Sequence, residues 1–162
     1  MDDDNAPVNL RCSAVVFRGD AVLLCQRPSG EWVLPGGTPR RGEGSAACVL
    51  REVREETGLR VDPQRVAFVL EATNLDQDQH LIEIVFHAFP VDSRAEPVAT
   101  EVGLDPRYVP VAHLPGLRMR PPIAGHVRSL HAMPELRAGV YLGNVWRPGQ
   151  SGAAISPEDR RT

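Results

Sequence analysis

The sequence predicts a mixed α/β (α+β) fold, in which a mixed or mostly antiparallel sheet and a few helices form one domain. Short apolar runs rich in β-forming residues alternate with one well-delimited amphipathic helix and with polar loops, and there is no internal repeat. The chain has 162 residues, of which 42% are hydrophobic, enough for a single core. We expect a flexible N-terminus at 1–9, the domain at 10–148, and a polar, disordered C-terminal tail at 149–162.

Three short strands are expected first. Residues 12–17 and 21–26 are apolar runs, and the Arg18-Gly19-Asp20 segment between them is typical of a hairpin turn. A third strand at 31–33 follows the Pro28-Ser29-Gly30 turn. Residues 34–44 are too rich in glycine and proline for regular structure, so this segment is predicted to be a loop.

A helix is predicted from Ser45 to Thr57. Ser45 is a suitable N-cap, and Gly58 is placed for a left-handed stop at the C-terminal end. Apolar or small residues recur at helical spacing, so we expect this face to pack against the sheet; they are Ala46, Leu50, Val53 and Thr57.

Further strands are expected beyond this helix at 65–72, 80–90 and 107–111. The second of these begins with alternating residues at Leu81, Glu83, Val85 and His87. Loops at 73–79 and 91–106 join these strands, and a second helix is expected at 123–132.

Composition excludes several classes of function. The net charge is −3, so the chain lacks the basic excess of a protein that binds long nucleic acids. All 18 cationic residues are arginines, which excludes a lysine Schiff base and a P-loop lysine. Three cysteines without a C-x-x-C pair favour a reducing cytoplasm. With no signal peptide and no long apolar stretch, we expect a cytoplasmic protein without a membrane partner.

Three glutamates stand out on the predicted helix. Glu52, Glu55 and Glu56 are spaced i, i+3 and i+4, so all three project from one side. Like charges at this spacing destabilise a helix by about 0.2–0.5 kcal/mol per pair, and a hard cation such as Mg²⁺ would offset that cost. Gly36 and Gly37, in the preceding loop, allow a ligand to approach the backbone closely. Taken alone, the charges also fit a solvated helix face with salt bridges.

The run from Gly37 to Leu59 reads GTPRRGEGSAACVLREVREETGL. This 23-residue segment resembles the Nudix box, the signature of the Nudix hydrolases, with every fixed position filled. The fixed positions are Gly37, Glu43, Arg51, Glu52, Glu55, Glu56 and Gly58, and the apolar ones are Val53 and Leu59. The resemblance extends over residues 10–125, so the solvated-face alternative is dropped for this segment.

The resemblance implies the Nudix fold, a mixed sheet sandwiched between helices, with Mg²⁺ or Mn²⁺ held by the box. Family members hydrolyse a nucleoside diphosphate linked to another moiety, by water attack on phosphorus. By matching positions, the resemblance implies metal binding by Glu52, Glu55, Glu56 and the Gly36 carbonyl. It also implies that Arg51 and Glu43 brace these ligands, that Gly37 lies against the substrate, and that Arg27 contacts a phosphate, although an ordinary exposed arginine is the alternative for Arg27.

The proton acceptor and the substrate remain open. Relatives use either the counterpart of Glu52 or a glutamate on a later loop, here Glu101 or Glu96, and we expect Glu52 to serve. Markers of ADP-ribose and dinucleoside polyphosphate use are absent from 75–77. A base-reading asparagine is also absent, because Ile123 follows Pro121-Pro122. The expected partner is a small nucleotide.

Two other functions are kept as alternatives. One is a module that binds a nucleotide or ADP-ribose without hydrolysing it. The other is a hydrolase of RNA 5′ ends, for which an arginine cluster is the supporting feature: Arg118, Arg120 and Arg128. Tyr141 and Trp146 are suited to anchor the C-terminal segment or to form a homodimer contact, and the sequence does not decide between them.

Overall fold

The computed structural model describes residues 7–74 and 79–147. The expected tail at 149–162 lies outside these residues. The first strand begins at Val8, two residues before the expected start of the domain at residue 10. Val8 and Asn9 are ordered because they pair with His80 and Leu81 of a later strand.

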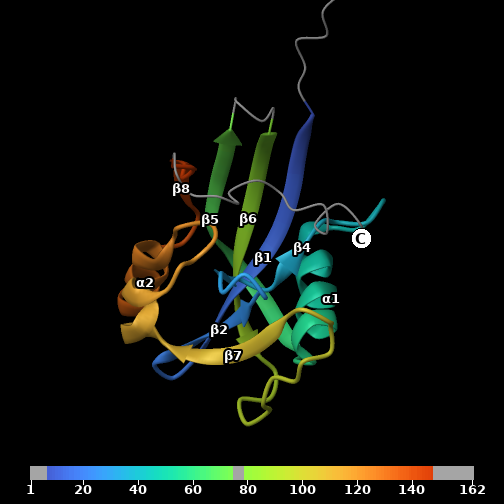
Figure 1. Cartoon of the computed structure of the whole chain (residues 1–162), viewed down its shortest axis with the longest axis vertical. Coiled ribbons are helices and arrows are strands. Elements are labelled where there is room, and N and C mark those ends of the chain that lie inside the picture. The colour runs from blue at the N-terminus through green and yellow to red at the C-terminus, as the bar shows by residue number, and fades with distance from the viewer. Residues whose placement is uncertain (1–6, 75–78, 148–162) are drawn as a thin grey trace, which may run out of the picture.

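An eight-stranded mixed sheet forms the centre of the molecule (Figure 1). The strand order is β3-β2-β1-β6-β5-β8, with β4 paired to β1 and β7 paired to β2. The β1–β6 and β5–β8 pairs are parallel, and the other pairs are antiparallel. The strands are β1 (Val8–Arg18), β2 (Ala21–Gln26), β3 (Trp32–Val33), β4 (Gly36–Gly37), β5 (Val61–Asn74), β6 (Gln79–Pro90), β7 (Asp105–Pro110) and β8 (Val140–Asn144).

Two α-helices flank this sheet on opposite sides, α1 (Ser45–Thr57) and α2 (Ala124–Ala132), and a 3₁₀ helix, η2, spans Val111–Gly116 (Figure 1). The expected arrangement of a mixed sheet between helices is therefore confirmed. No helix among the described residues is long and apolar enough to cross a membrane.

The sheet separates two hydrophobic cores. The α1-side core joins the helix to β1 and its neighbours through residues such as Val16, Cys48 and Val53. The α2-side core is larger and contains Phe68, Leu130 and other side chains from β1, β5, β6 and α2. Because side chains alternate along β1, successive residues of this one strand contribute to both cores.

Two details of the first helix differ from prediction. The N-cap is Gly44, with an extended backbone, because its carbonyl accepts the Cys48 N–H at 2.9 Å; Ser45 is already helical. Leu50 is 45% exposed and does not pack against the sheet, whereas Val53 is fully buried. The buried side of α1 consists of Cys48, Val49, Glu52, Val53, Glu56 and Thr57.

Two strands were not predicted. Gly36 and Gly37 form β4, within the segment expected to be a loop, because they pair with Ser13 and Cys12 of β1. β8 pairs with β5 near the end of the described chain. Both depend on a partner strand distant in sequence.

Candidate active site

The two glycines of β4 bring α1 close to the sheet. A Cβ on Gly36 would overlap the backbone of Cys12 and Ser13. A Cβ on Gly37 would overlap the carboxylate of Glu52. Glycine is therefore required at position 36, where the contact is with backbone, whereas a larger residue at position 37 would displace the Glu52 carboxylate.

Glu52 and Glu56 lie on the buried side of the helix, with exposed fractions of 3% and 7%. The Gly36 N–H donates to Glu56 Oε2 at 3.2 Å. Burial raises the pKa of Glu56 to about 8; the Arg11 guanidinium opposes this shift, and the charge of Glu52 adds to it. A bound cation next to Glu56 would favour its ionised form.

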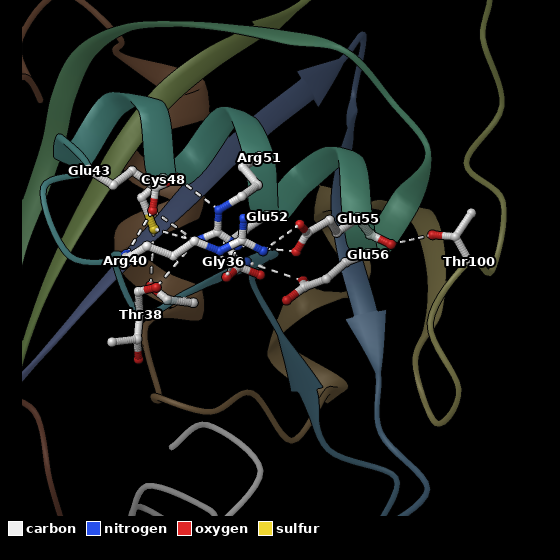
Figure 2. A network of polar contacts seen from close by, with 11 residues as sticks. Gly36, Thr38, Arg40, Glu43, Cys48, Arg51, Glu52, Glu55, Glu56 and Thr100 are labelled. Atoms are coloured by element: carbon white, nitrogen blue, oxygen red, sulfur yellow. Dashed lines mark hydrogen bonds and ion pairs between the residues drawn. The ribbon is translucent and has the colours of Figure 1, made fainter. Parts of the chain in front are cut away.

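Arg51 joins the acidic residues into one network, which Figure 2 shows around its guanidinium. Its Nε and Nη2 donate to the two carboxylate oxygens of Glu43 at 2.7 and 2.9 Å. Its Nη1 donates to Glu52 Oε1 at 2.8 Å and to Glu55 Oε2 at 3.1 Å. The hydrogen bond from Arg51 lowers the pKa of Glu43 to about 2. The guanidinium thus fixes the orientation of three carboxylates.

Glu55 occupies the outer edge of this network, with its side chain 42% exposed. Arg40 Nη2 donates to its Oε1 at 3.2 Å. On the other side of the residue, the Thr100 hydroxyl donates to the backbone carbonyl of Glu55, which ties the loop after β6 to the helix (Figure 2). Glu55 therefore differs from Glu52 and Glu56, which are buried.

The donor set suits a hard cation, because carboxylate and carbonyl oxygens are the ligands that Mg²⁺ prefers. In 7–74 and 79–147, no three His, Cys, Asp or Glu side chains are arranged to hold a metal ion by themselves. Mg²⁺ in proteins is usually held by one or two carboxylates together with water and substrate phosphates.

A pocket of about 290 Å³ lies on the α2 side of the sheet. Three arginines contribute to its lining, Arg11, Arg27 and Arg120. Thr38 also lines it, and the Thr38 carbonyl accepts a hydrogen bond from Arg51 Nη2 at 3.3 Å. The pocket and the acidic network therefore share a residue.

The two loop glutamates proposed as proton acceptors have different surroundings. Glu96 pairs with Arg18 at 2.9 Å and its side chain is 72% exposed. Glu101 precedes β7, and its negative charge contributes, after burial, to the raised pKa of Glu56. Of the two, Glu101 is the one whose charge acts on the pKa of Glu56.

The arginines that motivated the RNA alternative do not share one pocket. Arg120 lines the pocket described above, whereas Arg128 lines a different one beside η2 and α2. Arg118 donates to the Ser29 carbonyl at 2.5 Å.

Sequence reasoning did not assign several residues to this pocket, among them Arg11, Glu83 and Trp146. Glu83 is completely buried. The signal was present in the sequence, because a carboxylate stands between Leu81 and Val85 on the apolar side of a strand. Pro121 and Pro122 also line the pocket, while Ile123 packs in the α2-side core.

Comparison with known proteins matches a part of the chain that includes the motif at residues 37–59. A family model described as the NUDIX domain matches residues 9–130. The "Uncharacterized Nudix hydrolase YvcI" of Bacillus subtilis strain 168 is 37% identical over 82 residues, 50% of this chain and 52% of that protein. The "NAD-capped RNA hydrolase NudC" of Stutzerimonas stutzeri strain A1501 is 31% identical over 120 residues, 72% of this chain and 42% of that protein. The chain thus spans about half the length of these relatives.

Among solved structures, a NUDIX hydrolase from Nitrosomonas europaea matches with a TM-score of 0.68. The match covers 80% of this chain and 91% of that one at 19% sequence identity. At this identity the similarity concerns the fold alone.

Proposed function

The chain belongs to the NUDIX domain family, and from this premise we propose that it is a Mg²⁺-dependent pyrophosphohydrolase of small nucleotides. The observation that carries the proposal is the position of the acidic network beside an arginine-lined pocket, with Thr38 common to both. Phosphates placed between them would meet cationic side chains on one side and carboxylates suited to a cation on the other.

The proposed ligands of Mg²⁺, or of Mn²⁺ in its place, are Glu52, Glu55, Glu56 and the Gly36 carbonyl. When bound, the cation neutralises phosphate charge and lowers the pKa of coordinated water. Glu52 and Glu56 are buried beside Gly36 and need little rearrangement. Glu55 is paired with Arg40 and Arg51, so it would join only by exchanging these partners.

We assign Arg51 and Glu43 as positioning residues, because their bidentate pair holds the guanidinium that orients Glu52. Glu52 is our choice as proton acceptor, since it sits on a rigid helix beside Arg51. Glu101 is the alternative. Arg27 and Gly37 are proposed to lie against the phosphates, Arg27 because it lines the same pocket as Thr38.

A small nucleotide is favoured over an RNA 5′ end, because Arg120 and Arg128 belong to different pockets. A binding module without turnover is the less favoured alternative, since all the carboxylates of the box are present. The cytoplasm remains our proposed location on the ground of three unpaired cysteines in the described chain.

The test is a panel of nucleoside triphosphates, nucleotide sugars, ADP-ribose and dinucleoside polyphosphates, assayed for release of phosphate or pyrophosphate. We expect turnover with Mg²⁺ or Mn²⁺, loss of activity with excess chelator, and no restoration by Ca²⁺, whose looser coordination misplaces the water. Full turnover in excess chelator would refute the metal dependence. Tight binding without turnover of any compound would favour the binding module.

A further inference from the structure

We infer that Glu83 selects the base of the bound nucleotide, by accepting a hydrogen bond from an exocyclic amino group. The inference rests on the proposed function only in taking the ligand to be a nucleotide. It names a specificity-determining residue and a substrate class: nucleotides of amino-bearing bases in preference to those of uracil or hypoxanthine.

The first observation is how one oxygen of this carboxylate is held. Glu83 is fully buried on β6, opposite Arg11 in the parallel β1–β6 register. Its Oε1 accepts hydrogen bonds from Ser13 Oγ at 2.7 Å and from Arg11 Nε at 3.3 Å. Arg11 is itself fixed by donating from Nη2 to the Leu34 carbonyl at 2.8 Å. Glu83 therefore has a set orientation and a cation beside its charge.

The second observation concerns the other carboxylate oxygen of Glu83, Oε2. Glu83 Oε2 is buried and has no hydrogen-bond partner among the described residues. Buried carboxylate oxygens are nearly always hydrogen-bonded, so an unpaired one in a pocket wall points to a partner supplied by a ligand. Since Oε2 can only accept, that partner must be an N–H or O–H group.

The third observation is the shape and chemistry around this oxygen. The pocket of about 290 Å³ is lined by apolar side chains suited to a flat ring, among them Val33, Leu81, Pro121 and Trp146. Thr38, which accepts a hydrogen bond from Arg51, joins the pocket to the acidic network. A nucleotide with its phosphates toward Thr38 would bring the edge of its base into the part of the pocket that contains Glu83.

These features favour an amino group over a carbonyl at the edge of the base. The amino group of cytosine, adenine or guanine can donate to Oε2. A carbonyl at the same ring position would place two acceptors against each other, with a buried negative charge on one side. The residue after Pro121-Pro122, where an asparagine was sought, is Ile123 in the core, so the recognising group is contributed by the sheet instead.

Replacing Glu83 by glutamine gives a sharp test, because the neighbours dictate how the amide must lie. Arg11 Nε can only donate, so the amide oxygen would be held at the position of Oε1. The amide nitrogen would then occupy the position of Oε2. An acceptor becomes a donor without a change in size, and the preference between bases should reverse.

The experiment measures binding of nucleoside monophosphates by calorimetry in the presence of Mg²⁺, since these ligands have no anhydride bond to cleave. The matched pairs are CMP with UMP, AMP with IMP, and GMP with IMP. For the ring that the pocket accepts, we expect the amino-bearing member to bind about 10- to 100-fold more tightly. In Glu83→Gln the preference should reverse for CMP/UMP or AMP/IMP and vanish for GMP/IMP.

Glu71→Gln is the matched control, because Glu71 lies on the neighbouring strand β5 and pairs with His80 at 3.5 Å, outside the pocket lining. It should keep the wild-type preference. Equal binding within every pair, binding of none of the nucleotides, or an unchanged preference in folded Glu83→Gln would each overturn the inference. If Glu83→Gln does not fold, the wild-type ratios alone decide. Failure of turnover with this binding preference intact would count only against the proposed hydrolysis.

Discussion

The two sides of the sheet hold buried negative charge in different ways. On the α1 side, Arg51 is shared among Glu43, Glu52 and Glu55, and the network opens to solvent at Glu55. On the α2 side, Glu83 is buried in the wall of the pocket, with two donors, from Arg11 and Ser13, on one oxygen and none on the other. The acidic network offers several oxygens around one cationic group, whereas Glu83 offers a single buried acceptor.

This difference indicates a division of labour. A cluster of carboxylates with a solvent-facing edge suits cation binding and proton transfer, which need exchangeable oxygens and water. A single oriented oxygen without a hydrogen-bond partner among the described residues suits recognition, because an unmatched ligand leaves a buried group unpaired. Four sets of substitutions test the α1 side of this comparison, and they are ordered by the size of the expected effect.

The largest effect is expected on turnover in the acidic network. Glu52→Gln should lower kcat by about 10²–10⁴-fold at saturating Mg²⁺, with partial recovery as pH rises, if Glu52 is the proton acceptor. Glu56→Gln should lower kcat sharply and be partly rescued by more metal, because it removes a ligand charge. Glu71→Gln, away from both sites, serves as the control. The measurement is kcat against pH and metal concentration.

The Glu101→Gln variant tests whether the proton acceptor is Glu52, on helix α1, or Glu101, on the loop before β7. If it loses more than a hundredfold in kcat with recovery at high pH, while Glu52→Gln recovers on adding metal, the proton acceptor is Glu101 and our assignment is wrong.

The next largest effect is expected at β4. Gly37→Ala should reduce activity and destabilise the fold by about 1–3 kcal/mol, because the new methyl group would overlap the Glu52 carboxylate and force this end of the side chain away from Arg51. Gly44→Ala is the control within the same segment, since its Cβ would meet nothing within 4 Å and its φ is −71°. Urea unfolding of both variants measures the difference. Equal stability of the two would contradict the close approach of Glu52 to Gly37.

A smaller effect distinguishes the two apolar residues of α1. Val53→Ala should cost about 1.5 kcal/mol of unfolding free energy, because Val53 is fully buried in the α1-side core. Leu50→Ala should change stability by less than about 0.5 kcal/mol, because Leu50 is 45% exposed. The reverse order would mean that the helix is rotated about its axis relative to the structure described here.

The smallest effect concerns acid stability. The folded pKa of Glu43, about 2, is below its ordinary value of 4.5, so its ionised form stabilises the fold above pH 4.5. That contribution is lost as pH falls from 4.5 to 2. Glu43→Gln should therefore be less stable than wild type near neutrality, and the gap should close over this window. Chemical unfolding at several pH values checks it, and a gap independent of pH would show that the Arg51 pairing is not its source.

Local features of the sequence were enough to predict the acidic helix. Its bounds, Ser45–Thr57, follow from apolar spacing and from Gly58, which ends it with a φ of 73°. The sequence did not predict which side of the helix is buried, because Val49 and Leu50 are adjacent apolar residues and either could pack in the core. Burial of Glu52 and Glu56 depends on β4, a pair of glycines with no strand propensity of their own.

The sequence by itself thus determined the family resemblance, the mixed fold and the set of box residues, since these depend on spacings within 23 consecutive residues and on strand-forming runs. Which residues come together in the pocket was decided only by the tertiary structure. Glu83 and Ser13 are 70 residues apart and meet through the parallel register of β1 and β6. That register is set by the burial of both faces of the sheet, and no local pattern specifies which carboxylate will stand opposite which donor.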